Sequence, residues 1–355
     1  MSAPGGFSLI TGGAGFVGTN LAARLLREGR QVLIFDNFSR PGARENLAWL
    51  APLDPERLCV EPADIRDAAA VRAAVESARE VFHLAAQVAV TTSLDAPFED
   101  FDVNARGTLN VLEALRALRD PPPLVYTSTN KVYGALGDVA LRAEPRRYVP
   151  DDPRIRNAGI DERRPLDFHS PYGCSKGAAE QYVLDYARCF GLRTAVFRMS
   201  CIYGPHQHGN EDQGWVAHFL IRARERGTLS IFGDGRQVRD VLYVEDLVDA
   251  LVLATRHMDA LSGRAFNIGG GPQSTLSLVE LLDIIREREG VPEVRHHPWR
   301  TGDQRYYVSD IGSFTRATGW APRTQVRQGI DKLRAWLDER ADRAAAPSYA
   351  VAGGR

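Results

Sequence analysis

Three glycines near the start of the chain limit its fold more than any other feature. The segment at residues 7–37 combines two short apolar runs, FSLIT and QVLIFD, with apolar residues at helical spacing between them. Gly12, Gly15 and Gly18 follow the first run in the spacing GxxGxxG and open the expected helix. A strand, a tight glycine turn, a helix and a second strand in this order predict a βαβ unit with parallel strands.

The same alternation of apolar runs and amphipathic segments continues to about residue 204. Strands that alternate with helices predict a parallel sheet covered by helices on both faces. We therefore predict an α/β fold with a Rossmann-type, doubly wound parallel sheet. The further expected strands are 57–65, 80–86, 123–130 and 193–204, and the further expected helices are 66–78, 98–118 and 170–191.

The pattern becomes less regular after residue 204. A chain of 355 residues exceeds a typical single core, which favours one large domain, residues 1–204, followed by a smaller lobe. We expect residues 205–340 to form this smaller C-terminal α/β lobe, although some of its strands could return to the main sheet. Residues 341–355 are small, polar and interrupted by proline and glycine, so a disordered tail is expected there.

Charge and cysteine content exclude several classes of function. With 44 basic and 45 acidic residues, the chain has no general field that would attract nucleic acid or an acidic membrane surface. No apolar run approaches the roughly 20 residues of a membrane span, and the first residues do not resemble a secretory signal. The cytoplasm is therefore the expected location. Four scattered cysteines without CxxC spacing favour neither disulfides nor a metal site.

The residue at the end of the second strand indicates what the glycine turn binds. Glycines in such a turn let the backbone approach a pyrophosphate, and the N–H groups that start the following helix hold the phosphates. Asp36 lies at the tip of the second strand, where a carboxylate accepts both hydroxyls of an adenosine ribose. The same charge repels a ribose phosphate, which favours NAD over NADP, although Arg40 nearby weakens that preference.

Two residues at the start of a later helix indicate proton transfer. Tyr172 and Lys176 are four residues apart in SPYGCSKG, so their side chains share one helix face. A phenol titrates near pH 10, but an adjacent ammonium and the positive charge of an oxidised nicotinamide would favour the phenolate. Tyr172 would then take the proton from a substrate hydroxyl while the hydride leaves. Thr129, at the end of the strand at 123–130, is expected to bind the same substrate oxygen.

These features together resemble the extended short-chain dehydrogenase/reductase family. The resemblance rests on the glycine motif, Asp36, HLAA at 83–86, Asn104, the strand-end hydroxyls and the YxxxK pair, and it covers nearly the whole chain. It implies NAD in the N-terminal domain, a nucleotide sugar in the C-terminal lobe, a dimer or tetramer of identical chains, and a catalytic triad of Thr129, Tyr172 and Lys176. The residues implied for the NAD site are Gly12, Gly15, Phe16, Val17, Asp36, Asn37, Ser39, Arg40, Asp64, Ile65, Leu84, Ala85, Ala86, Gln87, Asn104, Thr127, Ser128, Tyr172, Lys176 and Met199.

Longer strings narrow the resemblance within that family. DNFSRPGARENLAWL, STNKVYG, LDFHSPYGCSKG, GRQVRDVL and GDQR are similar to members that invert carbon 2 of a CDP-hexose, of the CDP-paratose or CDP-tyvelose type. The resemblance implies that the substrate is oxidised transiently to a 2-keto sugar and that the hydride returns to the opposite face. The stretch 146–165 is richer in charge than the resemblance leads one to expect, and it is a candidate for substrate contact.

The resemblance also implies where the substrate lies. Arg239 and Arg300, with Arg305 as a third candidate, would hold the diphosphate, because arginine presents a planar fork to phosphate oxygens. The alternative role of these arginines is ordinary surface ion pairing. Asp303 would hold the nucleotide ribose. The remaining candidates for substrate contact are Gln87, Val88, Thr129, Asn130, Lys131, Ser200, Cys201, Gln213, Ile231 and Phe232, together with His169 and Trp215, which could equally be core or gate residues.

The two residues after Thr129 separate the competing functions. Dehydratases that resemble this chain carry Asp-Glu there, where this chain has Asn130 and Lys131. An amide cannot supply the acid, and an ammonium cannot replace a carboxylate base, so dehydration is not expected. A UDP-hexose or UDP-hexuronate 4-epimerase is the main alternative, and a non-catalytic NAD-sensing protein is a distant one. Asn130 and Lys131 would contact the sugar or a keto intermediate, unless Lys131 points away and pairs with a neighbouring acid.

Overall fold

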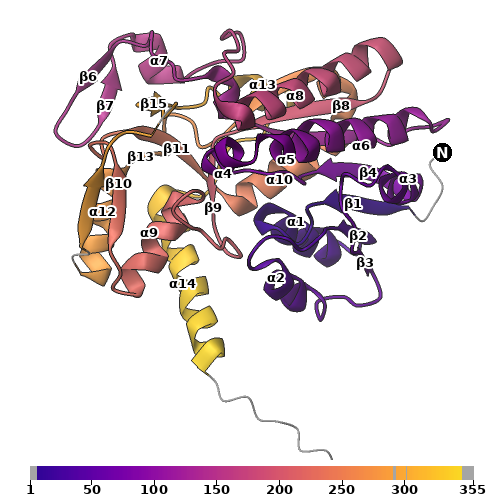
Figure 1. The fold of residues 1–355 in the computed structure, drawn as a ribbon, viewed down its shortest axis with the longest axis horizontal. Helices are drawn as coiled ribbons and strands as arrows, with labels where there is room; N and C mark the ends of the chain where they lie inside the picture. The colour runs from indigo at the N-terminus through magenta and orange to yellow at the C-terminus, as the bar shows by residue number, and fades with distance from the viewer. Residues whose placement is uncertain (1–5, 291–292, 301, 346–355) are drawn as a thin grey trace, which may run out of the picture.

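The larger lobe is built on a sheet of seven parallel strands in the order β12-β8-β5-β4-β1-β2-β3, which confirms the predicted fold (Figure 1). The computed structural model describes residues 6–290, 293–300 and 302–345. The strand order reverses between β1 and β4, and open sheets of this kind bind ligands in the crevice at such a switch point. The strands are β1 (Phe7–Thr11), β2 (Val32–Phe35), β3 (Leu58–Glu61), β4 (Ala78–His83), β5 (Leu124–Thr129), β8 (Thr194–Met199) and β12 (Arg264–Ile268).

Helices cover both faces of this sheet, and its central strands are therefore buried on both sides. On one face Leu21 of α1 and Leu251 of α10 belong to one hydrophobic core, which extends to Phe314 of α13. On the other face Val111 of α6 and Val183 of α8 belong to a second core. The first face carries α1 (Phe16–Arg27), α2 (Ala43–Leu50), α10 (Val244–Arg256), α11 (Met258–Leu261) and α13 (Gly312–Thr318), and the second carries α3 (Ala68–Glu76), α4 (Val90–Asp95), α5 (Pro97–Phe101), the π-helix η1 (Asp102–Arg106), α6 (Gly107–Arg116) and α8 (Ser170–Phe190).

The smaller lobe contains two further sheets around a third core. Strand β12 lies within 205–340 but pairs with β8, so this segment does return to the main sheet. Helix α14 extends to residue 345, so it includes the first part of the predicted tail, and residues 346–355 lie outside the described residues. The elements are β9 (Cys201–Tyr203), α9 (Trp215–Arg224), β10 (Leu229–Phe232), β11 (Val238–Tyr243), β13 (Thr275–Ser277), α12 (Leu278–Glu289), β14 (Val294–His297), β15 (Tyr306–Tyr307) and α14 (Val326–Ala345).

One predicted strand, 193–204, is divided between the two lobes, so the prediction of a continuous strand was wrong. The chain leaves the main sheet after Met199 and enters the smaller sheet at Cys201, where β9 pairs with β11. Ser200 lies between them, and its hydroxyl donates to the carbonyl oxygen of Asp240 (3.0 Å). This crossing places residues from both lobes at the carboxyl end of β8.

The charged stretch 146–165 connects the two lobes. Arg147 donates to both carboxylate oxygens of Glu280 in α12 (2.6 and 2.7 Å), and Glu162 accepts a hydrogen bond from the N–H of Asn267 in β12 (2.8 Å). The stretch therefore acts as a brace beside the smaller lobe (Figure 1). The stretch contains β7 (Tyr148–Pro150) and α7 (Pro153–Ala158), and the 3-10 helix η2 (Asn130–Tyr133) and β6 (Leu141–Ala143) precede it in the chain.

Candidate active site

The turn between β1 and α1 is too tightly packed for side chains. Gly12 has a φ of +69°, and a Cβ atom there would lie 2.8 Å from the backbone nitrogen of Ala85. A Cβ atom on Gly18 would lie 2.5 Å from the carbonyl oxygen of Gly12, so glycine is needed for α1 to pack this closely on the turn. Gly15, the N-cap of α1, has no side chain to occupy the N–H groups of the first helical turn. The turn therefore fits a pyrophosphate.

Asp36 follows β2 and faces this turn. Its carboxylate accepts hydrogen bonds from the N–H groups of Ala14 (3.0 Å) and Phe38 (2.8 Å). Burial raises the pKa of Asp36, while these bonds and the charge of Arg40 lower it. A carboxylate held beside the glycine turn fits the ribose end of NAD.

The segment after β4 lies against the same turn. The N–H of Gln87 donates to Asn104 Oδ1 (2.9 Å), and Asn104 Nδ2 donates back to the carbonyl of Gln87 (3.1 Å). The N–H of Ala85 donates to the Thr11 hydroxyl (3.2 Å), which fixes this segment to β1. Residues predicted for the cofactor site therefore gather at one edge of the sheet. The others at this edge are Phe16 and Val17 in the first turn of α1, Asn37, Ser39, Asp64 and Ile65 beyond β2 and β3, Leu84 and Ala86 beyond β4, Thr127 and Ser128 in β5, and Met199 in β8.

Replacing Asp36 with alanine should weaken NAD retention by a factor of about 10 to 100, because hydrogen bonds to a charged group contribute about 1.5–3 kcal/mol each. The measurement is the NAD released from purified protein after denaturation, together with the Kd for added NAD. Arg239→Ala is the matched control and should retain NAD. If Arg239→Ala lost NAD and Asp36→Ala kept it, the assignment of the two lobes would be reversed.

The predicted triad meets at the carboxyl end of β5. Thr129 ends that strand, and Tyr172 and Lys176 lie in the first two turns of α8. Burial raises the pKa of Tyr172 to about 12, against a hydrogen bond with Thr129 and the charge of Arg40. Tyr172 is therefore a neutral phenol at pH 7, hydrogen-bonded to the hydroxyl that was predicted to share its substrate oxygen.

Lys176 is directed at the end of β5. Its Nζ donates to the carbonyl oxygen of Thr127 (2.6 Å) and lies 4.3 Å from the centre of the Tyr126 ring. Burial lowers the pKa of Lys176 to about 7, against the charges of Glu180 and Asp100. From the sequence we expected this ammonium to favour the Tyr172 phenolate, whereas the charge that lowers the pKa of Tyr172 belongs to Arg40. An oxidised nicotinamide would add a second positive charge with the same effect.

Behind the triad lies a buried ion pair that was not predicted from the sequence. Glu180 in α8 accepts hydrogen bonds from Arg198 Nε (3.0 Å) and from the Ser128 hydroxyl (2.7 Å). Arg198 also donates to the Tyr133 hydroxyl (2.9 Å), which in turn donates to Asn267 Oδ1 (2.8 Å). The available sequence signals were a glutamate on the buried face of α8 and an arginine inside the apolar strand TAVFRM.

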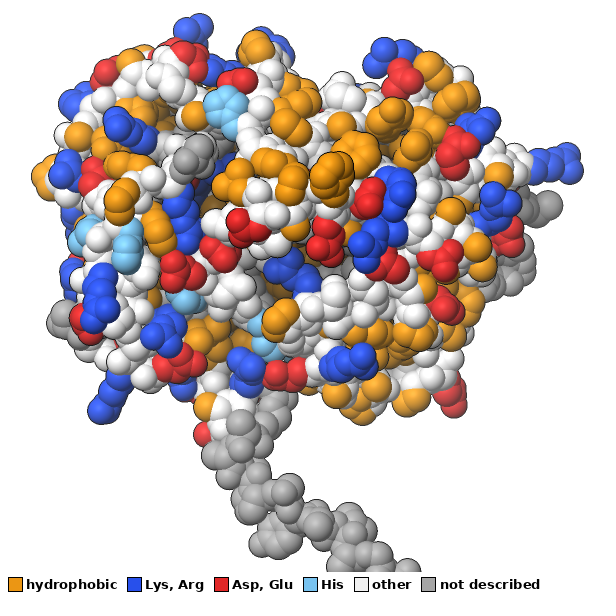
Figure 2. All heavy atoms as spheres, in the orientation of Figure 1, with side chains coloured by type: hydrophobic (Ala, Val, Ile, Leu, Met, Phe, Trp, Pro, Cys, Tyr) orange, Lys and Arg blue, Asp and Glu red, His pale blue; other side chains and the backbone are white. Residues whose placement is uncertain are grey.

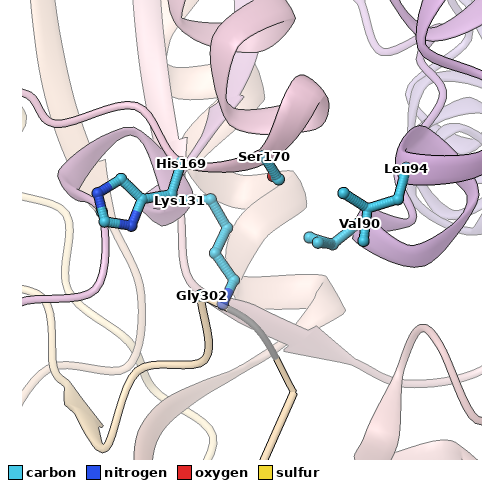
Figure 3. A pocket seen from close by; sticks show the side chains of 7 residues that line it. Val90, Leu94, Lys131, His169, Ser170 and Gly302 are labelled. Carbon is cyan, nitrogen blue, oxygen red and sulfur yellow. The ribbon is translucent and has the colours of Figure 1, made fainter.

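A cavity of about 380 Å³ opens beyond Thr129 and is lined from both lobes. Lys131 extends into it toward Gly302, with Val90 and Leu94 on the other side (Figure 3). Lys131 Nζ also lies 3.8 Å from the carboxylate of Asp303, so this lysine pairs with a neighbouring acid while it lines the cavity, and its contact with a sugar stays a prediction. Asn130 is buried beside Thr129. The lining residues are Val90, Leu94, Lys131, Gly134, His169, Ser170 and Gly302.

Most of the other predicted substrate contacts lie in the smaller lobe, while Val88 and His169 precede helices of the larger lobe. The guanidinium of Arg300 lies 3.8 Å from the centre of the Phe232 ring and donates to Glu211. Trp215 Nε1 lies 3.4 Å from Cys201 Sγ. Four other candidates have polar partners: Arg239 pairs with Asp303, Ser200 with Asp240, Gln213 with Arg40 and His169 with Asp167. The guanidinium of Arg305 lies over the rings of Tyr148 and Trp299. Ile231 is buried in β10, and Val88 precedes α4.

The charged stretch reaches a second cavity, of about 480 Å³. Arg164 and Pro165 line it, and His169 is common to both cavities. Arg164 pairs with Asp138, which also lines this second cavity. The charged stretch 146–165 therefore lines the second cavity, whereas Lys131 lines the first.

Comparison with known proteins shows the family. The NAD dependent epimerase/dehydratase family model matches residues 8–269. This chain belongs to that family. This confirms the predicted enzyme class and cofactor: the chain is an NAD-dependent enzyme of the sugar-nucleotide epimerase family.

Three similar proteins show the range of this family. CDP-paratose 2-epimerase from Salmonella typhi is 44% identical over 336 residues, which cover 92% of this chain and 98% of that protein. UDP-glucose 4-epimerase from Mycolicibacterium smegmatis is 35% identical over 328 residues, with 92% and 96% covered. The crystal structure of Thermus thermophilus UDP-glucose 4-epimerase in complex with NAD has a TM-score of 0.76 at 32% identity, with 93% and 98% covered.

In the part of the chain that the structure describes, no helix combines the length and the apolar character that crossing a membrane requires. Within the same residues, no group of three or more His, Cys, Asp or Glu side chains is placed to hold a metal ion. All four cysteines are free.

Proposed function

We propose that this enzyme inverts carbon 2 of a CDP-hexose, of the CDP-paratose or CDP-tyvelose type. The observation that carries the proposal is the pair Asn130 and Lys131 directly after Thr129 of the triad. Elimination would need an acid and a base beside the keto sugar, and these positions hold a buried amide and a cavity-lining amine. The 44% identity to a CDP-paratose 2-epimerase supports carbon 2 and the cytidine nucleotide.

The triad would perform the oxidation and the return step with the same groups. The positive charge of bound NAD would lower the pKa of Tyr172 and favour its phenolate, which would then take the proton of the carbon 2 hydroxyl, with Thr129 orienting the same oxygen through their shared hydrogen bond. Lys176, fixed by the carbonyl of Thr127, would hold the nicotinamide ribose. Bound NAD would supply the hydride acceptor and donor. Tyr172 would then return the proton to the oxygen when the carbon centre has been reduced from its opposite face.

Inversion requires the sugar to turn while the nucleotide stays in place. Val90 and Leu94 give the cavity an apolar wall, which offers a keto sugar no directional bonds. Arg239 would hold the diphosphate with its planar fork. An anchored nucleotide and a loosely held sugar together allow both faces of carbon 2 to meet the same hydride donor.

The proposal is tested by NMR on purified enzyme in deuterated buffer with CDP-paratose, CDP-tyvelose, CDP-glucose or UDP-glucose. Inversion at carbon 2 without deuterium from solvent is expected for the CDP sugars, because the hydride returns from within the enzyme. Inversion confined to carbon 4 would reject the 2-epimerase. Absence of turnover on every sugar nucleotide would support a protein that senses NAD without chemistry.

A UDP-hexose 4-epimerase is the second candidate. It is favoured by the 35% identity to a UDP-glucose 4-epimerase over most of both chains and by the same triad. The two functions differ in which sugar hydroxyl lies beside Tyr172, so the NMR product distinguishes them directly.

We also propose that two chains associate through α4, α5 and α8. Five large apolar side chains are exposed there, among them Phe98 (88% exposed), and orange side chains gather over α4 and α5 in Figure 2.

We expect light scattering to give at least twice the mass of one chain for the wild type. The double substitution Phe98→Asp with Phe101→Asp should lower this mass to that of one chain. Val60→Asp, at an exposed apolar site on β3, should keep the larger mass. A single-chain mass for the wild type would contradict this association. The five residues are Leu94, Phe98, Phe101, Tyr182 and Phe190.

A further inference from the structure

One carboxylate is shared by two cations at the border between the two lobes. Asp303 Oδ1 accepts a hydrogen bond from Arg239 (2.8 Å) and another from the N–H of Gln304 (3.0 Å). The same oxygen lies 3.8 Å from Lys131 Nζ. The side chain of Arg239 is 10% exposed and that of Lys131 25%, so water compensates these charges poorly. One negative charge therefore serves two positive charges.

The other titratable groups around Lys131 do not remove the excess positive charge. Cys201 on β9 stays a neutral thiol, because burial raises its pKa. His169, which lines the same cavity, pairs with Asp167 (2.9 Å). Arg239 on β11 and Asp303, in the loop before β15, complete the set that faces this lysine. The cluster is thus prepared to receive an anion.

The charge state of Lys131 is balanced within this cluster. Burial and the charge of Arg239 lower the pKa of Lys131 to about 8, while Asp303 acts in the opposite direction. A dianion bound to Arg239 would offset the guanidinium charge and leave Asp303 for Lys131. Both changes favour the charged form of the amine.

We propose that binding of the substrate's diphosphate at Arg239 drives protonation of Lys131 beside the sugar. This rests on the proposed placement of a nucleoside diphosphate group at Arg239. The nucleotide is the part of the substrate that does not react, and its binding would create a positive charge, with charge-assisted hydrogen bonds, at the part that does. At pH 8 and above, where Lys131 would otherwise be largely the neutral amine, its ammonium then faces a sugar or ketone oxygen only when the nucleotide is anchored.

The experiment is calorimetry of CDP binding to the NAD-loaded enzyme in two buffers of different ionisation enthalpy, which yields the protons taken up per CDP bound. A group that titrates at about 8 is half protonated at pH 8, so the wild type should take up close to half a proton there. The difference in uptake between the wild type and Lys131→Met should approach zero at pH 6.5, where Lys131 is already charged and only the terminal phosphate of CDP, with a pKa of about 6, still exchanges protons. Lys131→Met should bind CDP without this uptake at pH 8.

A second variant tests whether Arg239 and Lys131 share the Asp303 carboxylate. Asp303→Asn removes the carboxylate and leaves Lys131 beside Arg239, so the pKa of Lys131 falls further and the uptake at pH 7 should rise above that of the wild type. Melting temperatures of both variants check the fold. The proposal is overturned if the wild type takes up no proton at pH 8, or if Lys131→Met takes up as many as the wild type, which would assign the proton to another amine such as Lys176.

Different results would contradict the coupling between diphosphate binding and Lys131 protonation and the proposed cytidine nucleotide. If UDP bound and CDP did not, the cytidine assignment would be wrong, and the proton count with UDP would still decide the coupling. If Arg239→Ala bound the nucleotide as tightly as the wild type, the diphosphate would lie elsewhere and the coupling would be refuted.

Discussion

Tyr172→Phe should lower kcat by a factor of about 10² to 10⁴, the usual contribution of a positioned acid–base group. The phenol is buried, with its hydroxyl bonded to Thr129, so phenylalanine fills the same space and removes the atom that accepts the proton. NAD content and melting temperature should stay close to those of the wild type. The rate is measured by NMR with the sugar nucleotide that the wild type converts.

Tyr182→Phe is the matched control for this substitution. Tyr182 lies on the same helix, with 48% of its surface exposed, so loss of its hydroxyl should leave kcat unchanged. A Tyr172→Phe enzyme within tenfold of the wild type would show that another group accepts the proton.

Glu180→Gln should lower the free energy of unfolding by about 3–5 kcal/mol, the cost of leaving one member of a buried ion pair without its partner. The side chains of Glu180 and Arg198 are 0% and 6% exposed, so water cannot take the place of the lost charge. Denaturant unfolding monitored by fluorescence measures the change. Glu287→Gln is the control, since the ion pair of Glu287 with Arg327 is exposed, and this variant should unfold like the wild type.

Removal of both charges separates the cost of an orphaned arginine from the value of the pair. Glu180→Leu combined with Arg198→Met should recover most of the stability that Glu180→Gln loses, because no unpaired charge remains in the interior. If the double variant were as unstable as Glu180→Gln, the pair itself would stabilise the fold, and the prediction would be contradicted.

Local spacing made the cofactor half of the molecule predictable. The glycines of the first turn, Asp36 after the second strand, and Tyr172 with Lys176 on one helix face all depend on neighbours within a few residues. Hydrophobic periodicity likewise predicted the doubly wound sheet. It could not show that the helix expected at 98–118 contains a π-helical turn around Asn104, because the apolar pattern stays helical throughout.

Contacts between distant segments were not predictable in the same way. Lys131, Arg239 and Asp303 were separate candidates in the sequence, and their shared charge appears only when η2, β11 and the loop before β15 meet. The strand expected at 193–204 gave no local sign of changing sheets at Ser200. Arg198 was hidden for the same reason, since its partner Glu180 lies on another element.

Strand β12 is synthesised well after its partner β8, and this order affects how the protein folds during synthesis. Strand β8 pairs on one side with β5, but its other edge is covered only by residues 264–268, which leave the ribosome after α9, β10, β11 and α10. Until then a nascent chain carries an unpaired, apolar strand edge, which is the kind of surface that recruits other chains into aggregates. Expression of residues 1–204 alone would make that state permanent, so the cofactor half is not a module that can be separated from the substrate half.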